Sequence, residues 1–127
     1  MKLLPLFEAV ELDEGRIGEV RSGLMYFDVH YIPHFQHRTV RHLDKHVVIR
    51  QDEILTLVSR GMQKLLDAIR DGHIKNQKRF ILSDGAPPFL NVIFEAYKLT
   101  EYRWRLVVIT VMKKDRFHPG TTFQIII

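Results

Sequence analysis

The sequence contains no cysteine among its 127 residues. Disulfides and thiolate metal sites are therefore excluded, which fits a reducing compartment, and we expect a cytoplasmic protein. No apolar run approaches the roughly 18 to 20 residues that a transmembrane helix requires, so we expect no membrane partner. The first residues do not predict a signal peptide, because Pro5 and Glu8 interrupt the short apolar stretch after a single lysine.

Several functional motifs are also missing. The sequence has no glycine-rich nucleotide loop, no nucleophile elbow and no carboxylate pair in a recognisable context, and we expect no cofactor. It has no internal repeat, low-complexity segment or linker. Hydrophobic residues make up 46% and aromatic residues 10% of the chain, which is enough for a core. We therefore expect one domain over residues 1–127, with residues 1–23 as an N-terminal arm of uncertain role.

The charged residues are distributed unevenly, although the formal net charge is only +4. The charged residues of segment 11–19 are four acids and one base, Arg16, whereas residues 34–50 carry Arg38, Arg41, Lys45 and Arg50 against one acid, Asp44. A concentrated basic segment favours a polyanionic partner, and nucleic acid is the first choice. A solvated basic helix face would have the same sequence pattern, so that alternative stays open.

Hydrophobic periodicity predicts the order β-α-α-β-β-β-β. Residues 24–32 alternate as a strand does, and residues 34–46 and 50–72 have helical spacing, the second ending at Gly72. Later strands are expected at 78–84, 89–97, 102–112 and 121–127. The fold class that we expect is α+β, with two N-terminal helices packed on an antiparallel meander sheet of four or more strands.

The run "HFQHRTVRHLDKH", residues 34–46, holds four of the seven histidines in the chain. A zinc site needs three or four protein ligands, but His34 with His37, or His42 with His46, could be completed only by Asp44 or His118, which have no recognisable spacing. The arginines and lysine nearby would also repel a dication. We therefore predict no metal site.

Acid–base chemistry suits the histidine run better. On a helix, residues four apart are neighbours, so His37 would lie beside Arg41, and Arg38 beside His42 and His46. Arginines nearby disfavour a cationic imidazole and keep it available as a base, and they can also bind a phosphodiester. RNA cleavage without a metal requires such groups. The candidate catalytic residues are His37, Arg41, His42, His46 and His118.

A second basic segment, "TVMKKDRFHPG" at residues 110–120, leaves a predicted central strand and contains Lys113, Lys114 and Arg116. With Arg38 and Lys45, these are the candidate nucleic-acid-binding residues. A hairpin edge kept soluble by lysines is the alternative. Trp104 lies between Arg103 and Arg105, so strand alternation places the arginines on the opposite face and favours a packed tryptophan. His30 is expected on the sheet surface, and His73 at a helix C-terminus.

The order of these segments resembles the small RelE-like and barnase/EndoU/colicin-type ribonuclease-fold families. A helix bearing histidine and arginine is followed by "VVIRQDEILTLVSRG", then by a strand meander with "LNVIFEAY" and "RLVVITVMKK". The likeness covers roughly residues 34–127, and "VVITVMKKDRFHPGTTFQI" looks like the tail of phage-encoded proteins of this type. The resemblance implies His37, Arg41, His42 and His46 on the helix, with Lys113 and Lys114 lining the same concave face.

Together these features favour a metal-independent endoribonuclease of toxin-like fold, with RNA as substrate and a ribosome or protein as a further partner. His37 or His42 would be the base, and His46 or His118 the acid. Two alternatives stay open: a nucleic-acid-binding module without catalysis, and a phage structural or host-interaction protein, which would place the protein in the host cytoplasm.

Overall fold

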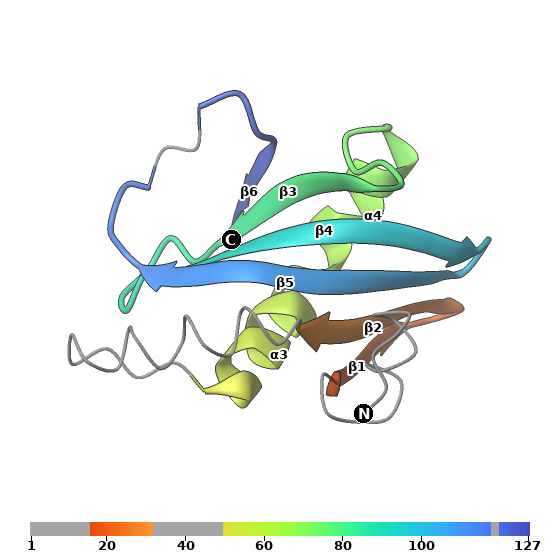
Figure 1. Cartoon of the computed structure of the whole chain (residues 1–127), viewed down its shortest axis with the longest axis horizontal. Helices are drawn as coiled ribbons and strands as arrows, with labels where there is room; N and C mark the ends of the chain where they lie inside the picture. Colours follow the sequence, from red (N-terminus) through yellow and green to blue (C-terminus); the bar gives the residue numbers. More distant parts are fainter. Residues whose placement is uncertain (1–15, 32–49, 118–119) are drawn as a thin grey trace, which may run out of the picture.

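The computed structural model describes residues 16–31, 50–117 and 120–127 of the chain. These residues form one six-stranded sheet and two helices (Figure 1). In chain order the elements are β1 (Arg16–Ser22), β2 (Met25–Tyr31), α3 (Gln51–Arg60), α4 (Met62–Arg70), β3 (Lys78–Ser83), β4 (Leu90–Thr100), β5 (Arg103–Lys113) and β6 (Gln124–Ile126). The strands lie in the order β1-β2-β5-β4-β3-β6.

The sheet is mixed. Antiparallel pairs join β1 to β2, β3 to β4 and β4 to β5. Two pairs are parallel, β2 with β5 and β3 with β6. Parallel neighbours require a long connection, and here the chain between β2 and β5 includes both helices and two strands. The centre of the sheet is therefore built from segments that are far apart in the sequence.

The expected fold class, two N-terminal helices on an antiparallel meander sheet, is wrong. The helices at 51–70 follow the first two strands and do not open the fold, and the sheet is mixed and not an antiparallel meander. Among the strands that the structure describes, only β3, β4 and β5 form a meander. The difference arises because parallel pairing depends on contacts between distant segments, which no local periodicity reports. The expected helix at 34–46 lies outside the described residues.

The predicted helix at 50–72 is present as two helices that meet at Gly61, where the chain passes close to the C-terminus. A Cβ atom added at Gly61 would lie 2.5 Å from Cδ1 of Ile127. The amide of Arg50 donates to the Glu53 carboxylate at 2.8 Å and caps the start of α3. No helix among the described residues is long and apolar enough to cross a membrane.

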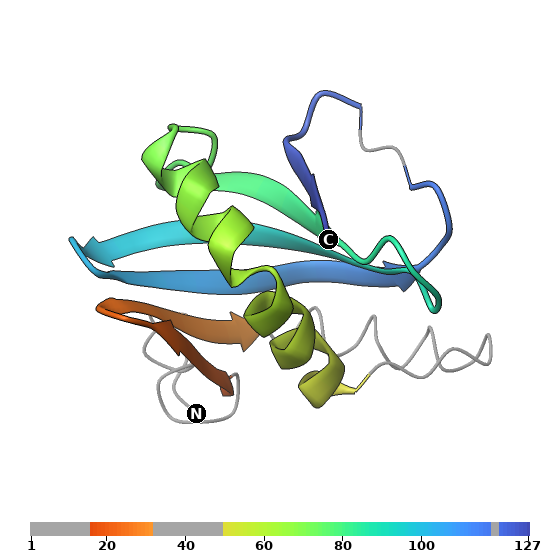
Figure 2. The same ribbon diagram turned by 180° about the vertical axis from the view of Figure 1, so that it is seen from behind.

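Both helices pack on one face of the sheet (Figure 2). Their buried side chains, among them Ile54, Val58 and Leu65, contribute to a single core. The sheet contributes large buried side chains to the same core, including Phe94, which stacks on Phe80 with ring centroids 5.4 Å apart. Burial of this apolar area is the main force that holds the helices on the sheet.

Strand alternation turns a second set of side chains to the face opposite the helices. In β5, Trp104, Leu106 and Val108 are buried in the core. Arg103 and Arg105 alternate with them and point to the opposite face, as the sequence predicted. Trp104 is packed in the core and so is not a platform for a base. The opposite face, by contrast, carries charged groups from four neighbouring strands.

Candidate functional site on the polar face of the sheet

Seven polar side chains on the face opposite α3 and α4 form what we call the polar sheet face: Asp28, His30, Arg79, Glu95, Tyr97, Arg103 and Arg105. The strand register places them next to one another. Glu95 of β4 lies opposite Arg79 of β3, and Tyr97 of β4 lies opposite Arg105 of β5. Arg105 is in turn the partner of Asp28 on β2. Because neighbouring strands are about 4.8 Å apart, these groups form one continuous polar row.

Glu95 and Tyr97 are the central pair of this row. The Tyr97 hydroxyl donates to Oε1 of Glu95 at 2.5 Å, and Nε of Arg79 lies 3.7 Å from Oε2 of the same carboxylate. The side chain of Glu95 is 26% exposed and that of Arg79 is 57% exposed, so both are accessible to a ligand. Burial and the hydrogen bond to Glu95 raise the pKa of Tyr97 to about 12. Tyr97 therefore keeps its proton at neutral pH.

Arg105 of β5 lies opposite Tyr97, and Arg103 lies two residues before it on the same strand, opposite Thr100. Nε of Arg103 donates to Oδ2 of Asp28 at 2.9 Å, and the Asp28 side chain is only 4% exposed. The Arg103 guanidinium also lies over the ring of Tyr26, 4.3 Å from its centroid. Arg105 is half-buried between the β2 and β4 residues of the row. Its charge therefore acts on groups of both strands.

His30 is a buried neutral histidine on the same face. Its side chain is 2% exposed, and its Nδ1 has no hydrogen-bond partner in the described part of the chain. Burial is the main cause that lowers its pKa to about 4, and the positive charges of Arg105 and Arg16 contribute to the same shift against the opposing effect of Asp28. The sequence placed His30 on the sheet surface; the face is correct, but the side chain is buried.

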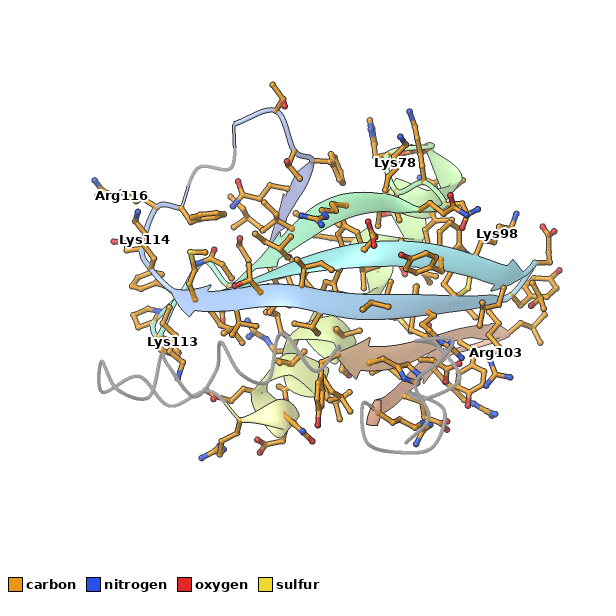
Figure 3. The ribbon with its side chains drawn as sticks, viewed as in Figure 1. Lys78, Lys98, Arg103, Lys113, Lys114 and Arg116 are labelled. Atoms are coloured by element: carbon orange, nitrogen blue, oxygen red, sulfur yellow. The ribbon has the colours of Figure 1, made fainter. Side chains whose placement is uncertain are left out.

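Three of the basic residues that were predicted to bind nucleic acid lie at or just after the C-terminal end of β5 (Figure 3). Lys113 forms an ion pair with Glu53 of α3, with Nζ 3.1 Å from Oε2. Lys114 and Arg116 are exposed and line a cavity of about 270 Å³. Lys114 and Arg116 are therefore brought together, whereas Lys113 binds to a helix on the other face.

The remaining predicted site residues lie outside the described ranges: His37, Arg38, Arg41, His42, Lys45, His46 and His118. Their assignment as catalytic or RNA-binding residues stays a prediction. Among the residues that the structure describes, no group of three or more His, Asp or Glu side chains could hold a metal ion.

Glu95, Tyr97 and Arg79 were not predicted from the sequence. Glu95 and Tyr97 alternate on one face of a recognisable strand, which was the available signal. Their partner Arg79 becomes visible only when the pairing of β3 with β4 is known.

Comparisons of the chain with protein-family models, with curated proteins and with solved structures find no match. The resemblance to RelE-like ribonucleases therefore stays a prediction, and the interpretation of the site depends on its geometry.

Proposed function

We propose that the protein is a metal-independent endoribonuclease whose catalytic centre is formed by Arg79, Glu95, Tyr97 and Arg105. The observation that carries this proposal is the hydrogen-bonded pair of Glu95 and Tyr97 between two arginines on one face of three adjacent strands. A carboxylate, a protonated phenol and two guanidinium groups supply a base, an acid and a phosphate-binding pair.

RNA suits this set of groups because it carries its own nucleophile. The 2′-hydroxyl of a nucleotide lies next to the phosphate that it attacks, so the protein needs to supply only proton transfer and charge stabilisation. In the proposed reaction Glu95 removes the proton of the 2′-hydroxyl, and the oxygen attacks phosphorus. The bond from phosphorus to the 5′-oxygen of the next nucleotide breaks. The products are a 2′,3′-cyclic phosphate and a free 5′-hydroxyl.

Tyr97 is the proposed proton donor to the departing 5′-oxygen. Its raised pKa keeps it protonated at neutral pH, and an alkoxide is a stronger base than a phenolate, so the transfer is favourable. The hydrogen bond between Tyr97 and Glu95 provides the return path, since the proton that Glu95 took from the 2′-hydroxyl can restore the phenol. The two residues then finish the step in their starting protonation states.

Arg79 and Arg105 are the proposed ligands of the reacting phosphate. They lie on the strands that flank β4, one on either side of the Glu95–Tyr97 pair. Charge accumulates on the phosphate oxygens in the transition state, and fixed guanidinium groups stabilise such charge. Two further cations, Lys114 and Arg116, lie just after the C-terminal end of β5 (Figure 3). They suit a polyanion that lies along the sheet.

The test is incubation of the purified protein with a mixed-sequence RNA in excess EDTA, followed by analysis of the fragment ends. We expect fragments that end in 2′,3′-cyclic phosphate and begin with a 5′-hydroxyl. Variants His37→Ala, His42→Ala and His46→Ala in the same assay test whether the histidine run contributes to catalysis.

Intact RNA under these conditions, with and without ribosomes, would contradict the proposal. The polar sheet face would then be a row of structural ion pairs. A salt-dependent binding titration would show whether the same cations hold nucleic acid without cleaving it.

A further inference from the structure

A cavity of about 270 Å³ lies where the ends of β3, β4 and β6 meet the turn after β5. Its volume is close to the lower end of the roughly 300–1,000 Å³ found for small-molecule pockets. Ser83, Asn91 and Gln124 line it. Strand alternation puts Ser83 on the same face of the sheet as Arg79, and Asn91 on the same face as Glu95. The cavity therefore opens on the side of the sheet that carries the proposed catalytic centre.

The rim of the cavity is held by the side chain of Asn91, which is only 3% exposed. Its amide nitrogen donates to the carbonyl oxygen of Phe89 at 3.0 Å and to that of Lys114 at 2.9 Å. Phe89 and Arg116, which both line the cavity, have positive φ angles of 59° and 55°. Such angles are uncommon for residues other than glycine and concentrate at binding sites. The rim is thus fixed in a conformation that costs free energy.

The polar groups inside the cavity form a paired donor and acceptor. Nε2 of Gln124 donates to Oγ of Ser83 at 2.9 Å and to the carbonyl oxygen of Phe117 at 3.1 Å. Among the described residues, no group accepts the Ser83 hydroxyl proton and none donates to Oε1 of Gln124. Within the described part of the chain, one donor and one acceptor are therefore left for a ligand. Nucleobases present such neighbouring donors and acceptors along their Watson–Crick edges.

Aromatic and cationic groups complete the lining. The half-buried rings of Phe89 and Phe117 provide apolar surface on which a base can stack. Lys114 and Arg116 supply two positive charges at the opening. The lining also contains two carboxylates, but Asp84 forms an ion pair with Arg60 at 2.9 Å, which leaves Asp115 as the opposing charge. Lys114 and Arg116 together therefore exceed Asp115 by one positive charge at the opening of the cavity.

We propose that this cavity binds one unpaired nucleotide, with its base between the phenylalanines and its phosphate at Lys114 and Arg116. The inference deepens the proposed function, because it assigns the place where a base of the same RNA is held. Along β4, Asn91 lies four residues from Glu95, which corresponds to about 13 Å of extended strand. A few nucleotides of single-stranded RNA can connect the two positions, so the cavity selects the sequence beside the bond that is cleaved.

The test is a titration of the full-length protein with AMP, GMP, CMP and UMP, followed by NMR chemical shifts or calorimetry. We expect saturable binding of at least one nucleotide. Phe117→Leu should weaken it about tenfold by removing the stacking surface. Arg116→Asn should also weaken it about tenfold, because asparagine tolerates the positive φ angle and removes only the charge. Phe123→Leu and Lys98→Gln are the matched controls and should bind as the wild type does.

The proposal is overturned if none of the four nucleotides binds, or if the two cavity variants bind as tightly as their controls. It is also overturned if inorganic phosphate or phenylalanine amide binds as tightly as the best nucleotide, because the cavity would then recognise only an anion or only an aromatic ring. The titration involves no cleavage, so it can fail while the ribonuclease proposal stands. Nucleotide binding without RNA cleavage would contradict the proposed ribonuclease activity and support the cavity as a nucleotide-binding site.

Discussion

Replacing Glu95 with glutamine should lower the rate of RNA cleavage about 100- to 10,000-fold, the range typical of removing a general base. Glutamine has nearly the same shape as glutamate, and its side-chain oxygen can still accept the hydrogen bond from Tyr97. It has no negative charge and cannot take the proton of a 2′-hydroxyl. The loss should therefore fall on catalysis, with the fold intact. The measurement is the initial rate of RNA cleavage in excess EDTA.

Glu101→Gln is the matched control, because Glu101 is an exposed glutamate in the turn between β4 and β5 and belongs to no part of the proposed site. It should cleave RNA at the wild-type rate. Thermal melting of both variants would confirm that they are folded. If Glu95→Gln retains the wild-type rate while folded, Glu95 is not the base, and the histidines of residues 34–46 become the first candidates.

The stability of the protein should fall by about 3 kcal/mol between pH 7 and pH 4 through His30 alone. The pKa of His30 is lowered from 6.5 to about 4 in the folded chain. Below pH 6.5 the unfolded chain therefore binds a proton that the folded chain does not, and acidification favours unfolding. The contribution of His30 to the unfolding free energy is complete above pH 6.5 and is lost as the pH falls from 6.5 to about 4.

Denaturant unfolding of the wild type and of His30→Gln, measured from pH 7 to pH 4, isolates this effect. Carboxylates titrate in both proteins, so their contribution cancels in the difference between the two curves. We expect the unfolding free energy of the wild type to fall by about 3 kcal/mol more than that of the variant. Parallel curves would mean that His30 takes up its proton without cost in the folded protein, and that it is not held neutral.

Local patterns predicted the parts of the fold that depend on neighbouring residues. The strand at β2, the helical residues 51–70 and the strands β3 to β5 follow from periodicity, as does the separation of Trp104 from Arg103 and Arg105. Strand β1 was not predicted, because its sequence, RIGEVRS, has a short and partly charged pattern that resembles an arm. It is a strand because β2 provides an edge to which it can pair.

The candidate site was harder to predict because it is assembled from pairings between strands. Arg79 and Glu95 are 16 positions apart in the sequence, and only the β3–β4 register brings them together. Asp28 and Arg103 meet through the parallel pairing of β2 with β5, which spans most of the chain. The histidine run is dense in the local sequence, whereas the polar sheet face has ordinary composition along each strand. The pairing register of the strands brings these residues together, and no local sequence pattern indicates it.

The measurement that tests the central proposal most directly uses a DNA strand with one ribonucleotide between randomised flanking bases, incubated with the protein in EDTA. We expect cleavage at the ribonucleotide alone, with a 2′,3′-cyclic phosphate at the new end and no cleavage of the all-DNA strand. The 2′-hydroxyl would then be the nucleophile. Cleavage of both strands, or of neither while the protein still binds them, would contradict RNA cleavage at the polar sheet face.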